Sequence, residues 1–472
     1  MNIKNENNLT IKKTKSSLEK REISSVELTN KYLKKIKMLN PKLNAFITVN
    51  EEFALKQAEN ADKMYRDGKK MPLLGIPIAL KDLFLTKGLK TTASSKMLDN
   101  YVPQYDAMVV EKLNSAGAII IGKLNCDAWA HGSSGENSDY GVVRNPWNTD
   151  YIPGGSSSGS AVAVASDTCI ASTGTDTGGS IRLPASFCNV VGLKPTYGRV
   201  SRYGIIAMAS SLDSIGHFTK TVEDSALMLN VTSGKDTKDA TTADIDSKNF
   251  ESKLENSIKG IKIGLPKEYF NNSLNKNIKD AIDKALMFYS ENGAEIIDIS
   301  LPHTEYSIAC YYIIQPAEVS SNLARYDGIR YGNTRDYFKE EAKRRIILGT
   351  FTLSAGYYDA YYKKAMQVRT LIKQDFEKAF EKVDAIITPT SPSLPWKIGE
   401  KTNDPLKMYL SDIYTVTANL AGIPGISIPI GFSNNLPVGM QILGPHFSEK
   451  LLFNLGHQYE INHEWHKMQP KI

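Results

Sequence analysis

Residues 151–183, YIPGGSSSGSAVAVASDTCIASTGTDTGGSIRL, hold two glycine- and serine-rich turns separated by small apolar residues. The first turn, 154–160, leads into the apolar run 161–165, so serine hydroxyls stand where a buried helix begins and its first N–H groups are unpaired. The second turn, 173–180, has adjacent glycines, which allow several backbone amides to point at one spot. A solvated linker would not carry the apolar segment between the turns. We therefore expect the chemistry of the protein in this stretch.

A serine hydroxyl needs a group that removes its proton before it can attack a carbonyl carbon. Residues 75–82, GIPIALKD, alternate with the period of a strand, which places Lys81 on the face opposite Leu80. A lysine at the end of an apolar strand is partly desolvated, and desolvation favours the neutral amine that acts as a base. His131 and His217 lie in no histidine-triad pattern, although folding can bring either one close to a serine. Lys81 is therefore the preferred base.

Two other motifs compete for the same glycine-rich turns. Ser157 is the centre of a G-x-S-x-G pattern, but that motif requires a preceding strand, and residues 145–153, NPWNTDYIP, are typical of a loop. A nucleotide P-loop requires a Gly-Lys-Ser/Thr ending, which neither turn has. Both interpretations rank below a serine and lysine site.

The arrangement of Lys81 in IALKD, Ser156 in PGGSSSGSA and Ser180 in GTDTGGSIRLPASFC resembles the amidase signature family. Ser156 follows Lys81 by 75 residues, Ser180 follows Ser156 by 24, and both spacings agree with the family pattern. The resemblance implies an α/β fold with a large mixed β-sheet between layers of helices. It implies that Ser180 is the acyl nucleophile, Ser156 a bridging serine and Lys81 the base. The backbone amides of the second turn would hold the oxyanion: Thr177, Gly178, Gly179 and Ser180.

Within this family, the chain is most similar to the A subunits of the amidotransferases that act on Glu-tRNA(Gln) or Asp-tRNA(Asn). The similarity is carried by residues 318–328, 344–350 and 408–422, the last of which read MYLSDIYTVTANLAG. This resemblance implies a glutamine substrate whose α-carboxylate binds Arg345 and whose α-ammonium binds Asp412. A bidentate guanidinium and a carboxylate together select a free amino acid amide. Further substrate contacts are expected from Tyr311, Ser133 and Ser134.

The same resemblance implies B and C partner subunits, with the tRNA held mainly by the partner. It implies no cofactor and no metal in this chain, while ATP and Mg²⁺ act at the partner subunit. The sequence leaves Arg344 and Arg345 open as the substrate arginine. It also departs from the pattern, with His131 where methionine is common, Ser158 where glycine is usual, and a shortened 331–344 connection.

Two rival functions stay open from the sequence. One is a free-standing amidase that hydrolyses a small amide with the same three residues and needs no partner. The other is a non-catalytic subunit in which the glycine-serine turns only pack tightly or bind an anion.

Composition bounds the class of protein. The 472 residues are 41% hydrophobic and 23% charged, which is ordinary for a globular chain with a large core, and the net charge of +6 is too dispersed for a dedicated nucleic-acid surface. We find no linker, so we expect one α/β domain over 71–472 with a helical segment, 1–70, packed on it. Four cysteines without C-x-x-C spacing predict reduced thiols, and the chain lacks a secretion signal or a long apolar run. A cytoplasmic protein with no membrane contact is expected.

Periodicity predicts the order of elements. Ser24 and Glu27 form a capping-box pattern before a helical stripe that starts at Leu28 and ends before Pro41. Strands are expected near Lys81 and in a series that extends one sheet: 118–121, 261–265, 295–299, 384–388, 425–430 and 439–443. Helices are expected at 107–116, from Val222 and at 282–292, and the polar stretch 232–252 predicts an exposed excursion.

Overall fold

One mixed β-sheet of eleven strands runs through the computed structural model, which describes residues 8–472. Across the sheet the strands lie in the order β1-β3-β2-β4-β6-β5-β10-β11-β9-β7-β8. Pairs β2–β3, β2–β4, β7–β8 and β7–β9 are parallel, and the others are antiparallel. The strands are β1 (Phe46–Val49), β2 (Pro77–Lys81), β3 (Ile119–Leu124), β4 (Ala171–Asp176), β5 (Val191–Lys194), β6 (Ser214–Thr219), β7 (Lys262–Pro266), β8 (Glu295–Ile299), β9 (Ala385–Pro389), β10 (Gly425–Ser433) and β11 (Leu436–Leu443).

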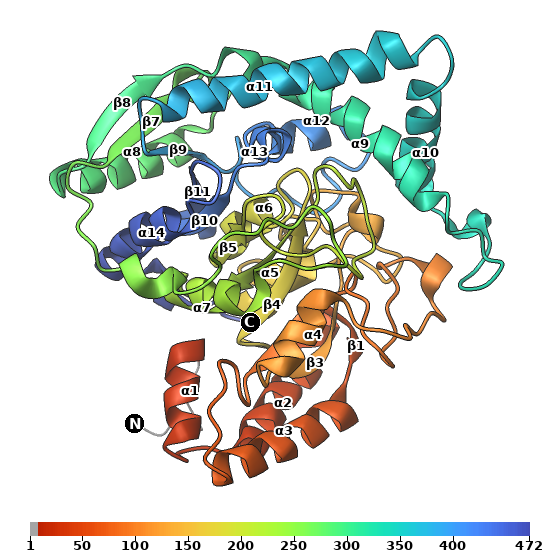
Figure 1. The fold of residues 1–472 in the computed structure, drawn as a ribbon, viewed down its shortest axis with the longest axis vertical. Coiled ribbons are helices and arrows are strands. Elements are labelled where there is room, and N and C mark those ends of the chain that lie inside the picture. The colour runs from red at the N-terminus through yellow and green to blue at the C-terminus, as the bar shows by residue number, and fades with distance from the viewer. Residues whose placement is uncertain (1–7) are drawn as a thin grey trace.

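Helices cover both faces of this sheet (Figure 1). On β3, Ile120 belongs to one buried cluster while Ile119 and Ile121 belong to another, as the alternation of a strand requires. The α-helices are α1 (Ile11–Glu19), α2 (Ser25–Leu43), α3 (Glu51–Arg66), α4 (Met108–Ser115), α5 (Ser158–Ala165), α6 (Arg182–Cys188), α7 (Val222–Thr232), α8 (Lys276–Glu291), α9 (Ser307–Leu323), α10 (Glu340–Thr352), α11 (Lys364–Phe380), α12 (Pro405–Tyr409), α13 (Val416–Ala421) and α14 (Glu449–His463). The expected sheet between helical layers is confirmed.

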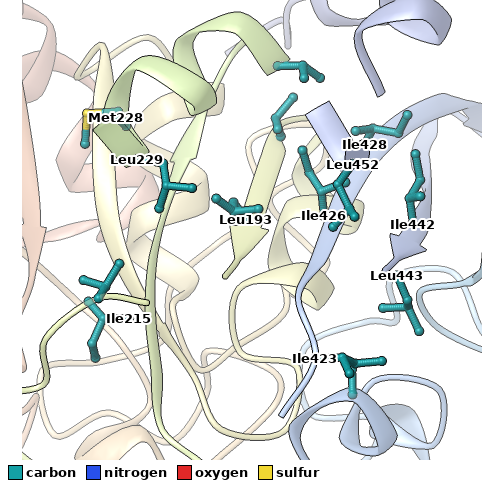
Figure 2. Close-up of a cluster of buried hydrophobic side chains, with 14 of the residues drawn as sticks. Leu193, Ile215, Met228, Leu229, Ile423, Ile426, Ile428, Ile442, Leu443 and Leu452 are labelled. Carbon is teal, nitrogen blue, oxygen red and sulfur yellow. The ribbon is translucent and has the colours of Figure 1, made fainter. Parts of the chain in front are cut away.

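The two faces of the central strands are packed differently. Figure 2 shows Leu193, Ile426 and Ile442 from β5, β10 and β11 beside Leu229 of α7 and Leu452 of α14. On the opposite face the short helix α6 lies directly on the backbone of the sheet. A side chain at Gly439 would place its Cβ 2.8 Å from the Cα of Ser186, so only glycine admits α6 at this distance. The residue before α6 in this tight layer belongs to the turn that carries Ser180.

The N-terminal segment departs from the all-helical prediction. Residues Phe46–Val49 form β1, which pairs with β3 at one edge of the sheet. The capping box of Ser24 and Glu27 is confirmed, but α2 continues through Pro41 to Leu43. Because a proline near the end of a helix removes only one backbone hydrogen bond, the last turn survives and ends at Asn44, which is left-handed. Residues 1–7 lie outside the described part of the segment.

The remaining predictions fall close to the observed elements. Strands β7 to β11 lie where the second half of the sequence predicts them, and they join the sheet of the first half. Helix α8 begins at Lys276, ahead of the predicted start. The stretch 232–252 is not a fully exposed excursion: Asp236 and Asp239 are buried, and they accept hydrogen bonds from Ser201 and from the backbone N–H of Arg202.

Three further observations bear on the class of protein. No helix among residues 8–472 is long and apolar enough to cross a membrane. All four cysteines are buried and unpaired, as expected. Within the same residues, no group of three or more His, Cys, Asp or Glu side chains is placed to hold a metal ion.

Helix α10 is held close to α9 at one glycine. A Cβ on Gly349 would lie 1.8 Å from the carbonyl oxygen of Pro316, which is backbone and cannot turn aside. We expect Gly349→Ala to separate the helices and destabilise the protein by about 2–3 kcal/mol, the usual cost of overpacking. The measurement is the thermal unfolding midpoint.

Gly456 supplies the matched control, because it also lies within a helix but its Cβ would meet only side-chain atoms, the nearest at 3.3 Å. Gly456→Ala should change stability by less than about 1 kcal/mol, since the gain in helix propensity offsets the tight contact. Equal midpoints for the two variants would contradict the close crossing at Gly349.

Candidate active site

Lys81 ends β2 in the interior, where its Nζ donates three hydrogen bonds. The acceptors are Ser156 Oγ at 2.9 Å, Ser157 Oγ at 2.9 Å and Thr175 Oγ1 at 2.8 Å. Burial lowers the pKa of Lys81 to about 8, an effect that nearby acidic groups such as Asp127 only partly offset. The amine is therefore far easier to deprotonate than an exposed lysine, and the minority that is neutral near pH 7, about a tenth, can accept a proton.

The two glycine-serine turns lie side by side, as the prediction of one joint site requires. The Ser157 N–H donates to the Ser180 carbonyl at 3.1 Å, and the Ser157 hydroxyl donates to the Thr175 carbonyl at 3.1 Å. Lys81 and Ser156 are fully buried, whereas Ser180 is 8% exposed. Ser180 is thus the member of the predicted triad that a substrate can reach. Its hydroxyl forms no hydrogen bond within residues 8–472, and such catalytic contacts often tighten only around a substrate.

Asp176, the last residue of β4, shapes the turn that follows it. Its carboxylate accepts hydrogen bonds from the backbone of Gly179 at 2.8 Å and Ile181 at 3.1 Å, and from the Arg182 guanidinium at 3.0 and 3.1 Å. Burial alone would raise the pKa of Asp176, but Arg182 outweighs it and the pKa falls to about 2. The carboxylate is therefore ionised, and it fixes the direction of the amides around Ser180.

This contact corrects one part of the predicted oxyanion hole. The Gly179 N–H is aimed at Asp176 and not at a substrate. Within the described chain the N–H groups of Thr177, Gly178 and Ser180 donate no hydrogen bond, so these three amides are available for a developing negative charge. Thr177 is anchored through its own hydroxyl, which donates to Asp213 at 2.7 Å.

A cavity of about 250 Å³ lies beside the site. Arg345, Ser133 and Ser134 are among its lining residues. Arg345 is 3% exposed, and its Nε donates to Glu341 at 2.8 Å. Arg345 forms no other hydrogen bond in the part of the chain described, so both of its Nη groups are free to bind an anion. Arg344 is 41% exposed and bonds the other oxygen of Glu341, which favours Arg345 as the substrate arginine.

Asp412 joins this cavity to the nucleophile turn. Its carboxylate accepts a hydrogen bond from Ser133 at 2.7 Å, and burial raises its pKa to about 7. The Thr415 hydroxyl bonds both the Asp412 carbonyl at 3.0 Å and the Gly178 carbonyl at 2.6 Å. A single threonine therefore connects the backbone of Asp412 to the turn of the reacting serine.

Tyr311 lies at the turn and not in the lining of the cavity, where its neighbour Tyr312 stands. A Cβ at Gly178 would fall 2.8 Å from the Tyr311 hydroxyl oxygen. Burial raises the pKa of Tyr311, so the phenol keeps its proton as a donor. Tyr311 is therefore close to the oxyanion amides, next in sequence to a residue of the cavity wall.

Sequence reasoning missed three residues. Thr175 and Ser157 accept hydrogen bonds from the Lys81 amine. Asp127 is fully buried and accepts hydrogen bonds from the backbone N–H groups of Gly135 and Asn137, so it orders the loop that carries Ser133 and Ser134 in the cavity wall. A signal was present for Thr175. Thr173 and Thr175 alternate along β4, and both contact Lys81, the first through the Lys81 backbone N–H at 3.0 Å.

The competing interpretations find no support in the geometry. His217 bonds Ser225 at 2.8 Å, and burial lowers its pKa to about 3. His131 is buried without a hydrogen-bond partner for either ring nitrogen among the described residues, and burial lowers its pKa, so it is neutral. The residues before Ser157 form no strand of the sheet. Ser158 packs against Gly135 and does not contact the Lys81 amine.

Comparison with known proteins is consistent with this geometry. The amidase family model matches residues 27–453. The A subunit of glutamyl-tRNA(Gln) amidotransferase from Thermoanaerobacter pseudethanolicus is 54% identical over 467 residues, covering 96% of each chain. The crystal structure of the protein of the same name from Thermotoga maritima is 44% identical, covers 96% of this chain and 94% of its own, and has a TM-score of 0.83. A peptide amidase in complex with chymostatin is 30% identical, covers 98% and 99%, and has a TM-score of 0.87.

Substitutions of the three central residues test their roles. We expect Ser180→Ala to abolish formation of an acyl-enzyme and Ser156→Ala to slow it by about 10²–10⁴-fold, the usual share of general acid–base catalysis. Lys81→Arg should form the acyl-enzyme no faster than Ser156→Ala does, because a guanidinium does not release its proton at these pH values. The measurement is the rate of covalent labelling by an acylating probe, and wild-type labelling of Lys81→Arg would refute the base assignment.

The low pKa of Lys81 predicts a pH profile. Because only the neutral amine accepts a proton, the acylation rate should rise about tenfold per pH unit below about pH 8 and level off above it. Thr175→Val removes an acceptor that stabilises the ammonium form, so the midpoint should move to lower pH.

Thr173→Val is the matched control for this profile, since Thr173 bonds the Lys81 backbone and not its amine. The midpoint of the control should stay where it is in the unchanged protein. A profile that is flat between about pH 6 and 8, against the expected slope, would show that Lys81 is not the titrating base.

Proposed function

This chain belongs to the amidase family, and we propose that it is the glutamine-hydrolysing subunit of a tRNA-dependent amidotransferase. One observation carries the substrate choice: the buried Arg345 and the buried Asp412 converge beside the Ser180 turn. An arginine with free Nη groups matches an α-carboxylate, and a carboxylate matches an α-ammonium group. A free amino acid amide satisfies both, whereas an amide without these groups would leave the Nη groups of Arg345 without an acceptor and the buried Asp412 without an ammonium partner.

The residues present account for each step of the hydrolysis. Ser180 Oγ attacks the side-chain amide carbon of glutamine, while Ser156 takes the Ser180 proton and passes its own to Lys81. The amides of Thr177, Gly178 and Ser180 hold the oxyanion. Lys81 then returns a proton through Ser156 to the nitrogen, the C–N bond breaks, and ammonia leaves. Water, activated by the same base, hydrolyses the acyl ester and releases glutamate.

The ammonia is the useful product in this proposal. It passes to a partner assembly, made of B and C subunits by analogy with the relatives, in which ATP and Mg²⁺ activate Glu-tRNA(Gln) for conversion to Gln-tRNA(Gln). In this proposal the cofactors of that step bind to the partner and not to this chain. The tRNA would be held mainly by the partner.

A free-standing amidase is the second candidate, because such enzymes share the fold. The TM-score to the peptide amidase, 0.87, is even higher than the 0.83 to the amidotransferase protein of Thermotoga maritima. Overall shape therefore does not separate the two functions. The presence of both Arg345 and Asp412 near the Ser180 turn favours the amidotransferase role, as does the higher identity, 54% and 44% against 30%.

The deciding experiment measures glutamate release by the purified chain, alone and with candidate partner subunits, Glu-tRNA(Gln) and ATP. We expect turnover that depends on Ser180 and rises with the partners. Arg345→Lys should raise KM by about 10–100-fold through loss of the bidentate contact, with a smaller change in kcat. Arg344→Lys is the matched control and should leave KM nearly unchanged, because Arg344 is exposed. Hydrolysis of other amides with glutamine ignored would identify a free-standing amidase.

A further inference from the structure

Helix α10 has two faces of different character. The buried face holds Arg345 and Gly349, which contact the substrate cavity and α9. The opposite face carries Arg344 and then three large apolar residues at the i+3, i+4 and i+7 positions, so all four share one stripe. These apolar residues are Ile347, Leu348 and Phe351, with 67%, 47% and 53% exposure. Figure 1 shows α10 at the periphery of the molecule, outside the sheet and its covering helices.

The stripe continues past the end of α10 onto the following turn. The Phe351 ring lies 4.1 Å from that of Tyr357, which stacks on Tyr361 at 5.9 Å. All three rings are exposed. A contiguous apolar and aromatic surface of this kind usually marks a protein interface. We call Ile347, Leu348, Phe351, Tyr357 and Tyr361 the α10 stripe.

The rim of the α10 stripe is basic. Apart from the buried Arg345, segment 339–364 contains five basic and three acidic side chains. Lys343 and Lys364 are exposed, and neither forms an ion pair within residues 8–472. An acidic rim on the partner would complement this charge. A second copy of this chain, docked symmetrically, would instead set one basic rim against another.

The α10 stripe lies one helical turn from two residues that line the substrate cavity. Arg344 and Arg345 both line the cavity, and both bond Glu341, each through a different carboxylate oxygen. A protein seated on the stripe would therefore lie beside the cavity in which we place the substrate. Ammonia that escapes into water is protonated and lost as a nucleophile, so a position close to this cavity suits the protein that accepts it.

We propose that the α10 stripe is the docking surface for the subunit that receives ammonia, which binds it with an apolar surface rimmed by acidic residues. The inference rests on the proposed function and adds to it the surface and the chemistry of the partner. The i, i+3, i+4, i+7 spacing suits insertion of α10 into a groove.

The test compares two double variants of the full chain. Ile347→Glu/Phe351→Glu places charge in the centre of the stripe, and Phe53→Glu/Met287→Glu does the same to two similarly exposed apolar residues on α3 and α8. We expect the stripe variant to bind the purified partner subunits at least about tenfold more weakly, as for loss of central interface residues. The control variant should bind as the unchanged chain does. Labelling of Ser180 by an acylating probe should be equal in all three, which shows intact folding and chemistry.

The outcomes separate this inference from the proposed function. Unchanged partner binding by the stripe variant, with normal Ser180 labelling, would overturn the docking surface alone. If the stripe variant instead loses binding to tRNA in the absence of the partner, tRNA occupies the stripe and the proposal is overturned. If it loses the ability to form a dimer of this chain, a second copy occupies the stripe, and the proposal is likewise overturned. Failure of the unchanged chain both to bind the partner and to release glutamate would overturn the proposed function and this inference with it. A charge-reversed rim, Lys343→Glu/Lys364→Glu, should weaken binding and reduce its dependence on salt.

Discussion

The buried ion pair between Asp176 and Arg182 organises the whole catalytic end of the sheet. Two charges without access to water are tolerated only if they are paired and their remaining donors are bonded. Here the guanidinium also donates to Gln441 on β11, to the Thr415 carbonyl and to Asn419 on α13. One pair thus ties the nucleophile turn to the opposite half of the chain. The Asp176 carboxylate also accepts a hydrogen bond from the Gly179 N–H group, so only the neighbouring N–H groups remain available to the substrate.

A low lysine pKa does not by itself identify the base. Burial lowers the pKa of Lys123 to about 8, as it does for Lys81. Lys123, however, lies 3.6 Å from Asp82 and donates to the Phe84 carbonyl, so it stabilises the fold. Both amines also donate to hydroxyl groups, but that of Lys81 donates to Ser156, which can both accept and donate a proton. The neighbours of the amine, and not its acidity, give Lys81 its chemical role.

Most of the fold could be predicted from local patterns. Strand periodicity located the strands of the second half, and the capping box located the start of α2. The patterns failed where pairing decided the outcome. The four-residue strand β1 exists because β3 offers it an edge, and Asp236 is buried because Ser201 lies opposite. Neither partner is near in sequence, so no local signal announces either contact.

The sequence by itself determined the chemical groups of the site, because Lys81, Ser156 and Ser180 stand in a spacing that a known family shares. Tertiary structure alone decided how those groups are used. It buried Arg345 while its neighbour in the cavity wall stayed exposed, brought Asp412 beside the turn of Ser180, and left the outer face of α10 uncovered. The physical reason is that residue types are set along the chain, whereas the burial of a charge and the neighbours of a side chain depend on contacts between distant segments.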